Sequence, residues 1–302
     1  MIDAHVHLVD FRQATPGAEA LIAAMDASAI DKAVVFGLPV KKKWSATEPG
    51  EPTYYMDDIA RCYYYSLTDE LVADEIEGLP EEARSRLAPL ACGVDPTDLA
   101  AVDELERTLE RRPGFWRGIG ELLLRHAELS SRLPDEFPRA DHPGTLRIAD
   151  LCERRGLPLM IHSNASAAGH EPEAYIHELE TLLQASGATM VWAHAGISEI
   201  HREHDHVVTV SRLLDTYPHL NIDISWAGLD GILGDDGTPA GSWLELIERF
   251  PDRVMLGSDA VGRFDRLGPS IELLNSVLAR LSPACGELVG HGNAERIFFG
   301  GV

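Results

Sequence analysis

Eight short runs of apolar and β-branched residues alternate with longer amphipathic segments along the chain. The runs cover Met1–Val6, Lys32–Leu38, Leu87–Val94, Phe115–Leu122, Pro158–His162, Thr189–His194, Leu220–Ser225 and Arg253–Ser258. Alternation of strand-type and helix-type patterns is typical of βα units, which form parallel sheets. Eight such strands close a (β/α)8 barrel. We therefore expect an α/β protein, a TIM barrel in which residues 1–302 form a single domain.

The amphipathic segments predict helices that surround this barrel. They cover Ala18–Ala29, Asp98–Arg112, Gly144–Arg155, Glu173–Ser186, Val207–Tyr217, Ser242–Phe250 and Pro269–Leu281, and Ser282–Val302 is expected to close the barrel bottom with one or two further helices. Gly156 and Gly187 each follow a predicted helix end, where a left-handed backbone favours glycine.

Three connections are expected to form the walls of a substrate pocket. Pro39–Asp57, Leu123–Pro143 and Gly196–His206 each follow a predicted strand, and the first two are too long to be simple turns. Loops in these positions emerge at the carboxyl face of a barrel, where barrel enzymes have their active sites.

The amino-acid composition argues against certain binding partners and indicates the cellular compartment. The net charge of −23 argues against a broad surface for nucleic acid or an anionic membrane. No apolar run reaches the roughly 18 residues of a membrane span, and no signal peptide precedes the first predicted strand. The four cysteines show no C-x-x-C spacing, which favours free thiols over disulfides. We expect a cytoplasmic protein that acts on a small molecule; the sequence leaves a homo-oligomer open.

Residues of the types that bind metals stand at the ends of five predicted strands. They are His5 and His7 on the first, Glu121 on the fourth, His162 on the fifth, His194 on the sixth and Asp259 after the eighth. His5 and His7 are two residues apart, so both side chains point to the same side of their strand. Because the carboxyl ends of barrel strands meet at one face, we expect these six side chains to form a metal centre.

Simpler interpretations exist for single members of this set. A lone histidine at a strand end is often a core or rim residue, and Glu121 has Arg117 or Arg125 as alternative ion-pair partners. A second H-x-H motif, His204-Asp205-His206, is interpreted as part of a solvated loop, with pocket lining as the alternative. The ordered recurrence of six such residues at strand ends favours the metal centre.

Several segments resemble the amidohydrolase superfamily, and in particular its amidohydrolase-related branch. They are Asp3–His7, His162-Ser163-Asn164, Trp192–Gly196, Gly257-Ser258-Asp259 and Gly292–Phe298, so that the likeness extends from residue 2 to residue 299. This branch also contains the aminocarboxymuconate-semialdehyde-type decarboxylases. The order H-x-H, glutamate, histidine, histidine, aspartate is specific for the superfamily and weak for the substrate.

The resemblance implies a role for each of the six residues. His5 and His7 would bind one divalent metal ion, Zn²⁺ being the first expectation, and Asp259 would bind it and carry a proton. His162 and His194 would complete the site, with Asp259 and His194 as the catalytic residues. Glu121 resembles the bridging glutamate of TatD-type nucleases and some lactonases, which allows one or two metal ions per chain. No lysine lies in the fourth strand, which excludes a carbamylated-lysine bridge there.

The pocket-lining predictions follow from position after the strands. Arg263, Trp226, Asn164 and Arg125 are expected to bind the substrate, and an arginine there can clamp a carboxylate. Rim packing is the alternative for Trp226 and Arg263. The run Lys41-Lys42-Lys43 is interpreted as solvated surface, with attraction of an anionic substrate as the alternative.

These observations together predict a metal-dependent hydrolase that uses metal-activated water on a small amide, ester or lactone. The alternative on the same scaffold is a non-hydrolytic, metal-dependent decarboxylase of a small carboxylic acid. A nuclease is disfavoured by the charge of −23, and a purely binding barrel by the presence of every expected ligand.

Overall fold

The computed structural model describes residues 1–126, 129, 132–133, 136–197, 206–226, 232–233 and 238–300. Its centre is a curled parallel sheet, as predicted. The barrel strands are β1 (Ile2–His7), β2 (Lys32–Phe36), β5 (Leu87–Ala91), β6 (Gly118–Leu123), β7 (Leu159–His162), β8 (Met190–Trp192), β9 (Leu220–Ile224) and β10 (Val254–Leu256), and β11 (Ala260–Val261) extends the sheet beside β1. The order of the strands in the sheet is β10-β9-β8-β7-β6-β5-β2-β1-β11. Neighbouring barrel strands follow one another along the chain, except that β11 lies beside β1.

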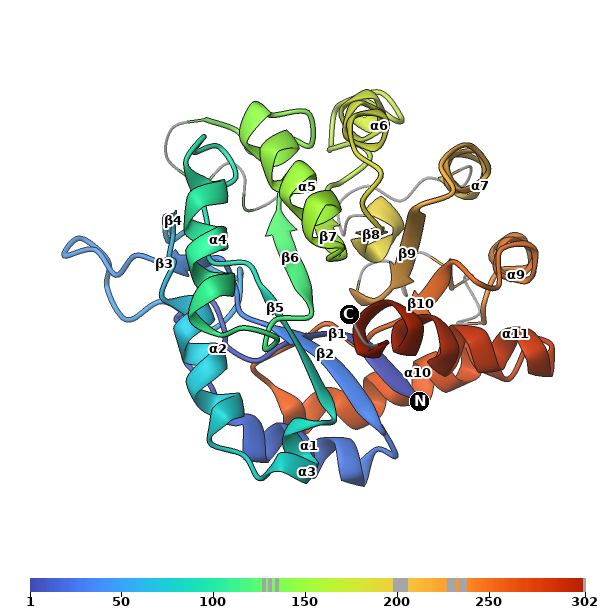
Figure 1. Cartoon of the computed structure of the whole chain (residues 1–302), viewed down its shortest axis with the longest axis horizontal. Helices are drawn as coiled ribbons and strands as arrows, with labels where there is room; N and C mark the ends of the chain where they lie inside the picture. Colours follow the sequence, from blue (N-terminus) through green and yellow to red (C-terminus); the bar gives the residue numbers. More distant parts are fainter. Residues whose placement is uncertain are drawn as a thin grey trace.

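Helices cover the outer face of this sheet (Figure 1). They are α1 (Ala18–Ala27), α2 (Thr68–Glu77), α3 (Glu81–Arg84), α4 (Ala101–Arg111), α5 (Pro143–Arg155), α6 (Ile176–Ala185), α7 (His206–Thr216), α9 (Gly241–Arg249) and α10 (Leu267–Leu278). Gly156 ends α5 with a left-handed backbone, as predicted. The same prediction for Gly187 is wrong, because α6 ends at an extended Ser186 instead. No helix in the described ranges is long and apolar enough to cross a membrane.

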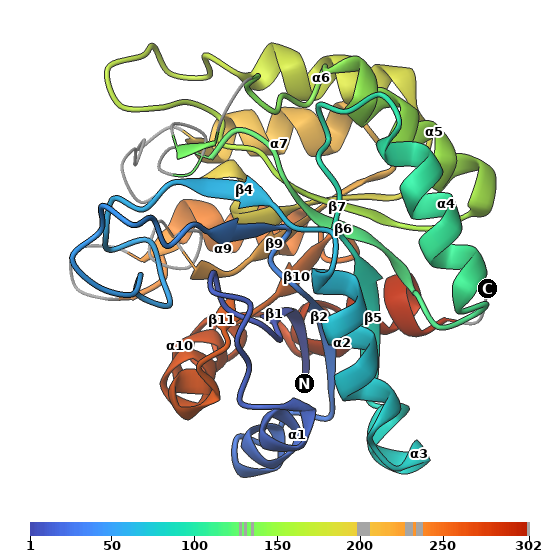
Figure 2. The ribbon, with the colours of Figure 1, turned by 90° about the vertical axis from the view of Figure 1, so that its left-hand side faces the viewer.

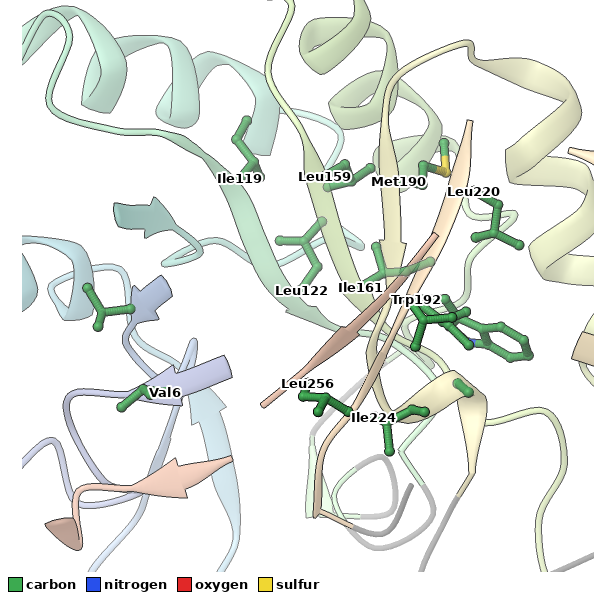
Figure 3. Close-up of a cluster of buried hydrophobic side chains, with 14 of the residues drawn as sticks. Val6, Ile119, Leu122, Leu159, Ile161, Met190, Trp192, Leu220, Ile224 and Leu256 are labelled. Atoms are coloured by element: carbon green, nitrogen blue, oxygen red, sulfur yellow. The ribbon is translucent and has the colours of Figure 1, made fainter. Parts of the chain in front are cut away.

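Two apolar layers hold the barrel together. The outer layer lies between strands and helices and includes Ile119, Leu159 and Trp192, all fully buried (Figure 3). The inner layer fills the barrel itself with side chains such as Phe36 and Met160. Phe298 joins this inner layer from the terminal segment, which contains α11 (Pro283–Glu287) and two π-helical turns, Leu288–Gly292 and Glu295–Phe299. The expected plug at the barrel bottom is thus present.

The last barrel strand is interrupted where the barrel closes. β10 pairs with β9, whereas β11 pairs with β1, and Gly257–Asp259 connect the two. The Asp259 N–H donates to the carbonyl of His5 (2.9 Å), and the Ser258 N–H donates to the Asp3 carboxylate (2.9 Å). A Cβ at position 257 would lie 2.5 Å from the Cβ of His5, so only glycine allows this close approach. The closing seam therefore passes through the predicted metal-binding residues.

The connection between β2 and β5 is more structured than the sequence indicated. It contains an antiparallel hairpin, β3 (Val40–Lys42) with β4 (Cys62–Tyr64), followed by α2 and α3. Pro39–Asp57 was predicted only as a long connection that forms a wall of the pocket. The hairpin projects on the side of the barrel toward which β6 points (Figure 2).

The interpretation of Lys41-Lys42-Lys43 as solvated surface is wrong for Lys42. Its side chain is fully buried, and its ammonium donates to Thr53 Oγ1 (3.1 Å) and to the carbonyl of Tyr55, and pairs with Asp58 (2.9 Å). Arg132 donates to the carbonyl of Met56 from the other side (3.0 Å). A buried ammonium requires such partners. Lys42 therefore holds the loop that carries Tyr55 and Met56.

Replacing Lys42 by methionine should destabilise the protein and release this loop. The change removes the ammonium group that pairs with Asp58 and donates to Thr53 and Tyr55, which costs about 1–3 kcal/mol in the free energy of unfolding. Urea denaturation measures this cost, and limited proteolysis reports cleavage near Tyr55. Lys43→Met, at an exposed neighbouring position, is the matched control. Equal stability and proteolysis of the two variants would contradict this role for Lys42.

Candidate metal centre

The structure brings the six predicted metal-binding residues together at the carboxyl ends of the barrel strands. β1 provides His5 and His7, β6 provides Glu121, and β7 provides His162. His194 lies in a short 3-10 turn after β8, and Asp259 lies in the seam between β10 and β11. Three groups have ligand atoms within 4.8 Å of one another: His5, His7 and Glu121; Glu121, His162 and His194; and His5, His194 and Asp259.

The Glu121 carboxylate lies between two pairs of histidines. Its Oε2 is 3.5 Å from His7 Nε2 and 3.7 Å from His5 Nε2. Its Oε1 is 3.3 Å from His162 Nδ1 and 3.4 Å from His194 Nε2. Each oxygen therefore faces one pair, which is the arrangement of a carboxylate that can bridge two cations.

Asp259 completes the group around the first pair. Its Oδ1 lies 3.2 Å from His7 Nε2 and 3.5 Å from His5 Nε2. Asp259 and His194 have positive φ angles of 51° and 56°, which non-glycine residues adopt at a cost. These backbones turn at the strand ends, where the side chains face the cluster.

Each histidine ring is oriented by a hydrogen bond at its other nitrogen. Nδ1 of His5 lies 3.1 Å from Asp223, Nδ1 of His7 lies 3.2 Å from the Gly37 carbonyl, Nδ1 of His194 lies 2.7 Å from Ser225 Oγ, and Nε2 of His162 lies 3.0 Å from Asn164 Oδ1. Donation of the proton to these oxygens leaves the lone pair of the second nitrogen facing the cluster. This is the usual way in which proteins fix metal-binding imidazoles.

Asp223 and Asp3 hold the metal-binding residues in place through hydrogen bonds. Asp223 is fully buried on β9; besides His5, it accepts from the His194 N–H (3.1 Å) and from the Ser225 hydroxyl. Asp3, also fully buried, accepts from the N–H groups of His5 (3.1 Å) and Ser258. Sequence analysis missed Asp223. A charged residue between Ile222 and Ile224 in an apolar strand was the available signal.

The centre holds more buried negative charge than its surroundings neutralise. Burial alone would lower the pKa of His5, but the charges of Glu121, Asp223 and Asp259 outweigh burial and raise this pKa to about 10. Burial opposes ionisation of Glu121, yet the facing histidines, His5 foremost, lower its pKa well below the usual range. The site thus favours a positive charge among these carboxylates.

A divalent cation fits this donor set. Within the described part of the chain, Glu121 Oε1 and Asp259 Oδ1 are buried and have no hydrogen-bond partner. Buried carboxylate oxygens without a donor are costly unless a cation satisfies them. Imidazole and carboxylate are the ligands that Zn²⁺ and similar ions prefer.

The predicted substrate-binding residues have different environments. Trp226 lines the cavity above the metal-binding cluster, whereas Asn164 contacts His162. Arg125 pairs with the buried Glu178 (2.7 Å) and stacks over the Tyr175 ring. Arg263 pairs with Asp265 (3.0 Å) and borders a separate surface groove beside α1. Neither arginine is among the described residues that line the cavity above the cluster, and their role in substrate binding stays a prediction. The alternative ion pair of Glu121 with Arg125 is likewise not formed.

Two of the connections predicted to form pocket walls contribute to the cavity lining. Tyr55 and Met56 come from Pro39–Asp57 and His126 from Leu123–Pro143, whereas Phe11, after β1, was not predicted. His126 stacks on His162, with ring centroids 4.4 Å apart. In the second H-x-H motif, His204 and Asp205 lie outside the described residues, whereas His206 is buried and contacts the carbonyl of Ala195 (2.6 Å).

The cluster of histidine and carboxylate side chains lies where barrel enzymes have their active sites, and it could hold a metal ion. The sequence profile of the family described as "Amidohydrolase" matches residues 2–300. The chain belongs to this amidohydrolase family, as the motifs indicated. No curated protein matches the sequence.

Solved structures share the fold at low sequence identity. A probable 2-pyrone-4,6-dicarboxylic acid hydrolase from Acinetobacter baumannii is 13% identical, with a TM-score of 0.61 over 99% of this chain and 98% of that one. Dihydroorotase from Campylobacter jejuni is 15% identical, with a TM-score of 0.56 over 99% and 82%. 2,6-Dihydroxybenzoate decarboxylase from Rhizobium is 15% identical, with a TM-score of 0.52 over 99% and 98%. This likeness establishes the fold, which hydrolases and decarboxylases share.

Metal analysis of Glu121→Gln tests the bridging arrangement. We expect about two equivalents of divalent metal per wild-type chain and about one in the variant, because the amide is a poor substitute for a bridging carboxylate. Elemental analysis of untagged, zinc-reconstituted protein measures this difference. Glu178→Gln makes the same change at a buried glutamate outside the cluster and should keep the wild-type content. Equal metal content in wild type and Glu121→Gln would refute the bridge.

Proposed function

We propose that this protein is a metal-dependent hydrolase that adds water to the carbonyl carbon of a small ester, amide or lactone. The observation that carries the proposal is the position of Glu121, with one carboxylate oxygen facing each histidine pair. Such a set can hold two cations, which suits attack by water better than loss of carbon dioxide. We propose Zn²⁺ as the cation, with His5, His7, Glu121, His162, His194 and Asp259 as its ligands.

The chemistry divides between the cation and the protein. A divalent ion held by these residues would supply Lewis acidity for the carbonyl group and would lower the pKa of water to about 7. Asp259 is placed to accept the proton of the attacking water, because its carboxylate lines the cavity and its side chain retains 9% exposure. The same carboxyl group then returns the proton to the leaving oxygen or nitrogen.

The remaining residues orient these groups. His194 lines the cavity and faces Glu121, so it contacts both the cluster and the space for the reacting group. Asp223 holds His5 and the backbone of His194, which fixes two ligands through one buried carboxylate. Trp226 covers the cluster on the cavity side.

A decarboxylase is the second candidate, and the fold shared with 2,6-dihydroxybenzoate decarboxylase is the observation that favours it. Such a reaction requires a cation that binds the substrate carboxylate, and the proposed divalent ion could supply it. Among the described residues, the cavity lining contains no lysine or arginine that would add a second cation, and Arg125 and Arg263 are paired elsewhere. The position of Glu121 between two pairs of histidines is therefore the observation on which the preference for hydrolysis rests.

We also propose a cytoplasmic location and a small-molecule substrate, without nucleic-acid or membrane partners. The four described cysteines are buried and free, which suits a reducing compartment. A homo-oligomer is compatible with this proposal.

Replacing Asp259 by asparagine tests the proposed proton transfer. Removal of a general base and acid should lower kcat by about 10²–10⁴-fold, with a smaller change in KM. Initial rates with esters, lactones and amides measure this loss, and release of carbon dioxide from aromatic acids tests the decarboxylase in parallel. Asp265→Asn, at a position paired with Arg263 outside the cavity, is the matched control. Wild-type turnover by Asp259→Asn would exclude the proposed role, and carbon dioxide release alone would select the second candidate.

A further inference from the structure

We propose that residues 44–60 form a movable strap over the metal-binding cluster, and that the Lys42 ammonium holds this strap in its closed position. A small molecule would reach the cluster when the contacts between the strap and Lys42 open. The inference concerns access to the centre, so it applies to a hydrolase and to a decarboxylase alike. Three observations carry it: the small volume of the cavity, the loose ends of the strap, and the contacts that Lys42 makes with it.

The cavity above the cluster is closed in this structure. Its volume is about 20 Å³, and a single buried water already needs roughly 10–15 Å³. Sites that bind small molecules usually offer about 300–1,000 Å³. A divalent cation held by the cluster would take up part of this space and would not enlarge it. A carbonyl compound therefore fits above the cluster only after part of the wall has moved.

The strap supplies a separate part of this wall. Most of the described lining belongs to the barrel strands or follows them directly, whereas Tyr55 and Met56 come from the strap, whose residues belong to none of the described strands. Moving the strap would therefore enlarge the cavity without displacing the six metal-binding residues. Other connections at this face include residues outside the described ranges, so the decisive variants change only the strap and its anchor.

The two ends of the strap lie at the hairpin of β3 and β4. Next to these strands, the Lys43 N–H donates to the Arg61 carbonyl (2.7 Å). Beyond this contact, the side chains of Trp44 and Ile59 are 62% and 86% exposed, so neither fixes an end of the strap by burial. The segment projects from the barrel in both views (Figure 1, Figure 2). The strap can therefore turn about the hairpin while the barrel strands stay paired.

Lys42 binds the strap at three residues. Its ammonium donates to Thr53 Oγ1 (3.1 Å), to the Thr53 carbonyl (3.3 Å) and to the Tyr55 carbonyl, and it pairs with Asp58 Oδ2 (2.9 Å). Since Lys42 stands on β3, these contacts join the strap to a fixed strand. Two further described contacts are donation from the Phe11 N–H to the Tyr54 carbonyl (3.2 Å) and from Arg132 to the Met56 carbonyl (3.0 Å).

These contacts suit a closure that is reversible. The side chain of Lys42 is fully buried, whereas that of Asp58 is 27% exposed, so the pair lies just beneath the surface. When the strap moves away, water can hydrate both charges, and opening leaves no unpaired charge in a dry interior. Ion pairs close to solvent contribute little net stability. The open and closed positions therefore differ little in free energy, as a gate requires.

Cys62 reports the position of the strap. It lies opposite Lys42 in the β3–β4 ladder, so both side chains are on the same face of the hairpin. Cys62 is buried, packs in the same apolar cluster as Met56, and lies 3.9 Å from the Ala60 carbonyl through its Sγ. Opening of the strap should expose this thiol. Cys152, buried on α5 in the outer apolar layer, is the internal control for global unfolding.

Labelling with N-ethylmaleimide, located by peptide mass spectrometry, tests the opening. We expect Cys62 to react at least about 100-fold faster than Cys152, at a rate that low concentrations of urea hardly change, because a local opening exposes little surface. Labelling of Cys152 requires global unfolding and should rise steeply with urea. Equal rates with the same urea dependence at both thiols would overturn the strap.

Variants of the ion pair test the anchor. Lys42→Met removes the ammonium, and Asp58→Asn removes only the charge of its partner. Each should raise the urea-independent labelling rate of Cys62 by at least about tenfold. Lys43→Met, at an exposed neighbouring position, is the matched control and should keep the wild-type rate. An unchanged Cys62 rate in both variants would refute the role of Lys42.

A thiol in the cavity wall tests whether opening admits a molecule. Leu38 lines the cavity and is buried, so Leu38→Cys should react slowly, and adding Asp58→Asn should raise this rate by at least about tenfold. Val261→Cys is a second probe in the same lining. Thermal denaturation checks that each variant folds. Fast labelling of both probes before the strap is altered would show an open cavity. Faster labelling of Cys62 without a change at either probe would show a strap that does not control access. Either result would overturn the gate.

Discussion

The buried charge of Glu121 is the constraint on which the rest of the site depends. A carboxylate in the interior of a barrel is stable only if positive or hydrogen-bonding groups surround it. Three strand ends supply those groups as four imidazoles, two toward each oxygen. Asp223 and Asp259 add further negative charge beside His5. The resulting excess can be neutralised by protons on histidine or by a divalent cation, and the orphaned oxygens of Glu121 and Asp259 favour the cation.

The strands bring the residues of this charge cluster together, and hydrogen bonds orient their side chains. The parallel strands place their carboxyl ends on one face, which brings residues from positions 5 to 259 within a few ångströms. Hydrogen bonds from Asp223, Ser225, Asn164 and the Gly37 carbonyl then set the orientation of each ring. Above the cluster, the loop held by Lys42 supplies Tyr55 and Met56 to the cavity lining. The cavity lining thus combines the metal-binding residues with side chains from this separate loop.

Sequence reasoning predicted the barrel because the apolar runs and their spacing are local properties of the chain. The six cluster residues were found for the same reason, since each follows a run whose end is visible. Asp223 was missed because its partners, His5 and the backbone of His194, are distant in sequence. The ion pairs of Arg125 with Glu178 and of Arg263 with Asp265 could not be predicted, because an arginine near a strand end pairs with whichever carboxylate is closest in space. Lys42 was assigned to the surface because its oxygen partners lie 11 to 16 residues later in a loop, and two of them are backbone carbonyls that no sequence pattern marks.

The interrupted last strand has a consequence for assembly of the site during folding. Asp259 joins the cluster only when the segment between β10 and β11 docks on β1, where its N–H meets the His5 carbonyl. A chain emerging during synthesis exposes His5 and His7 early, but it cannot complete the cluster until almost all residues have been made. A cation bound to the finished cluster would hold the first and last strands together and oppose local opening at their junction. Metal binding would therefore stabilise only the completed barrel, in which the first and last strands are joined.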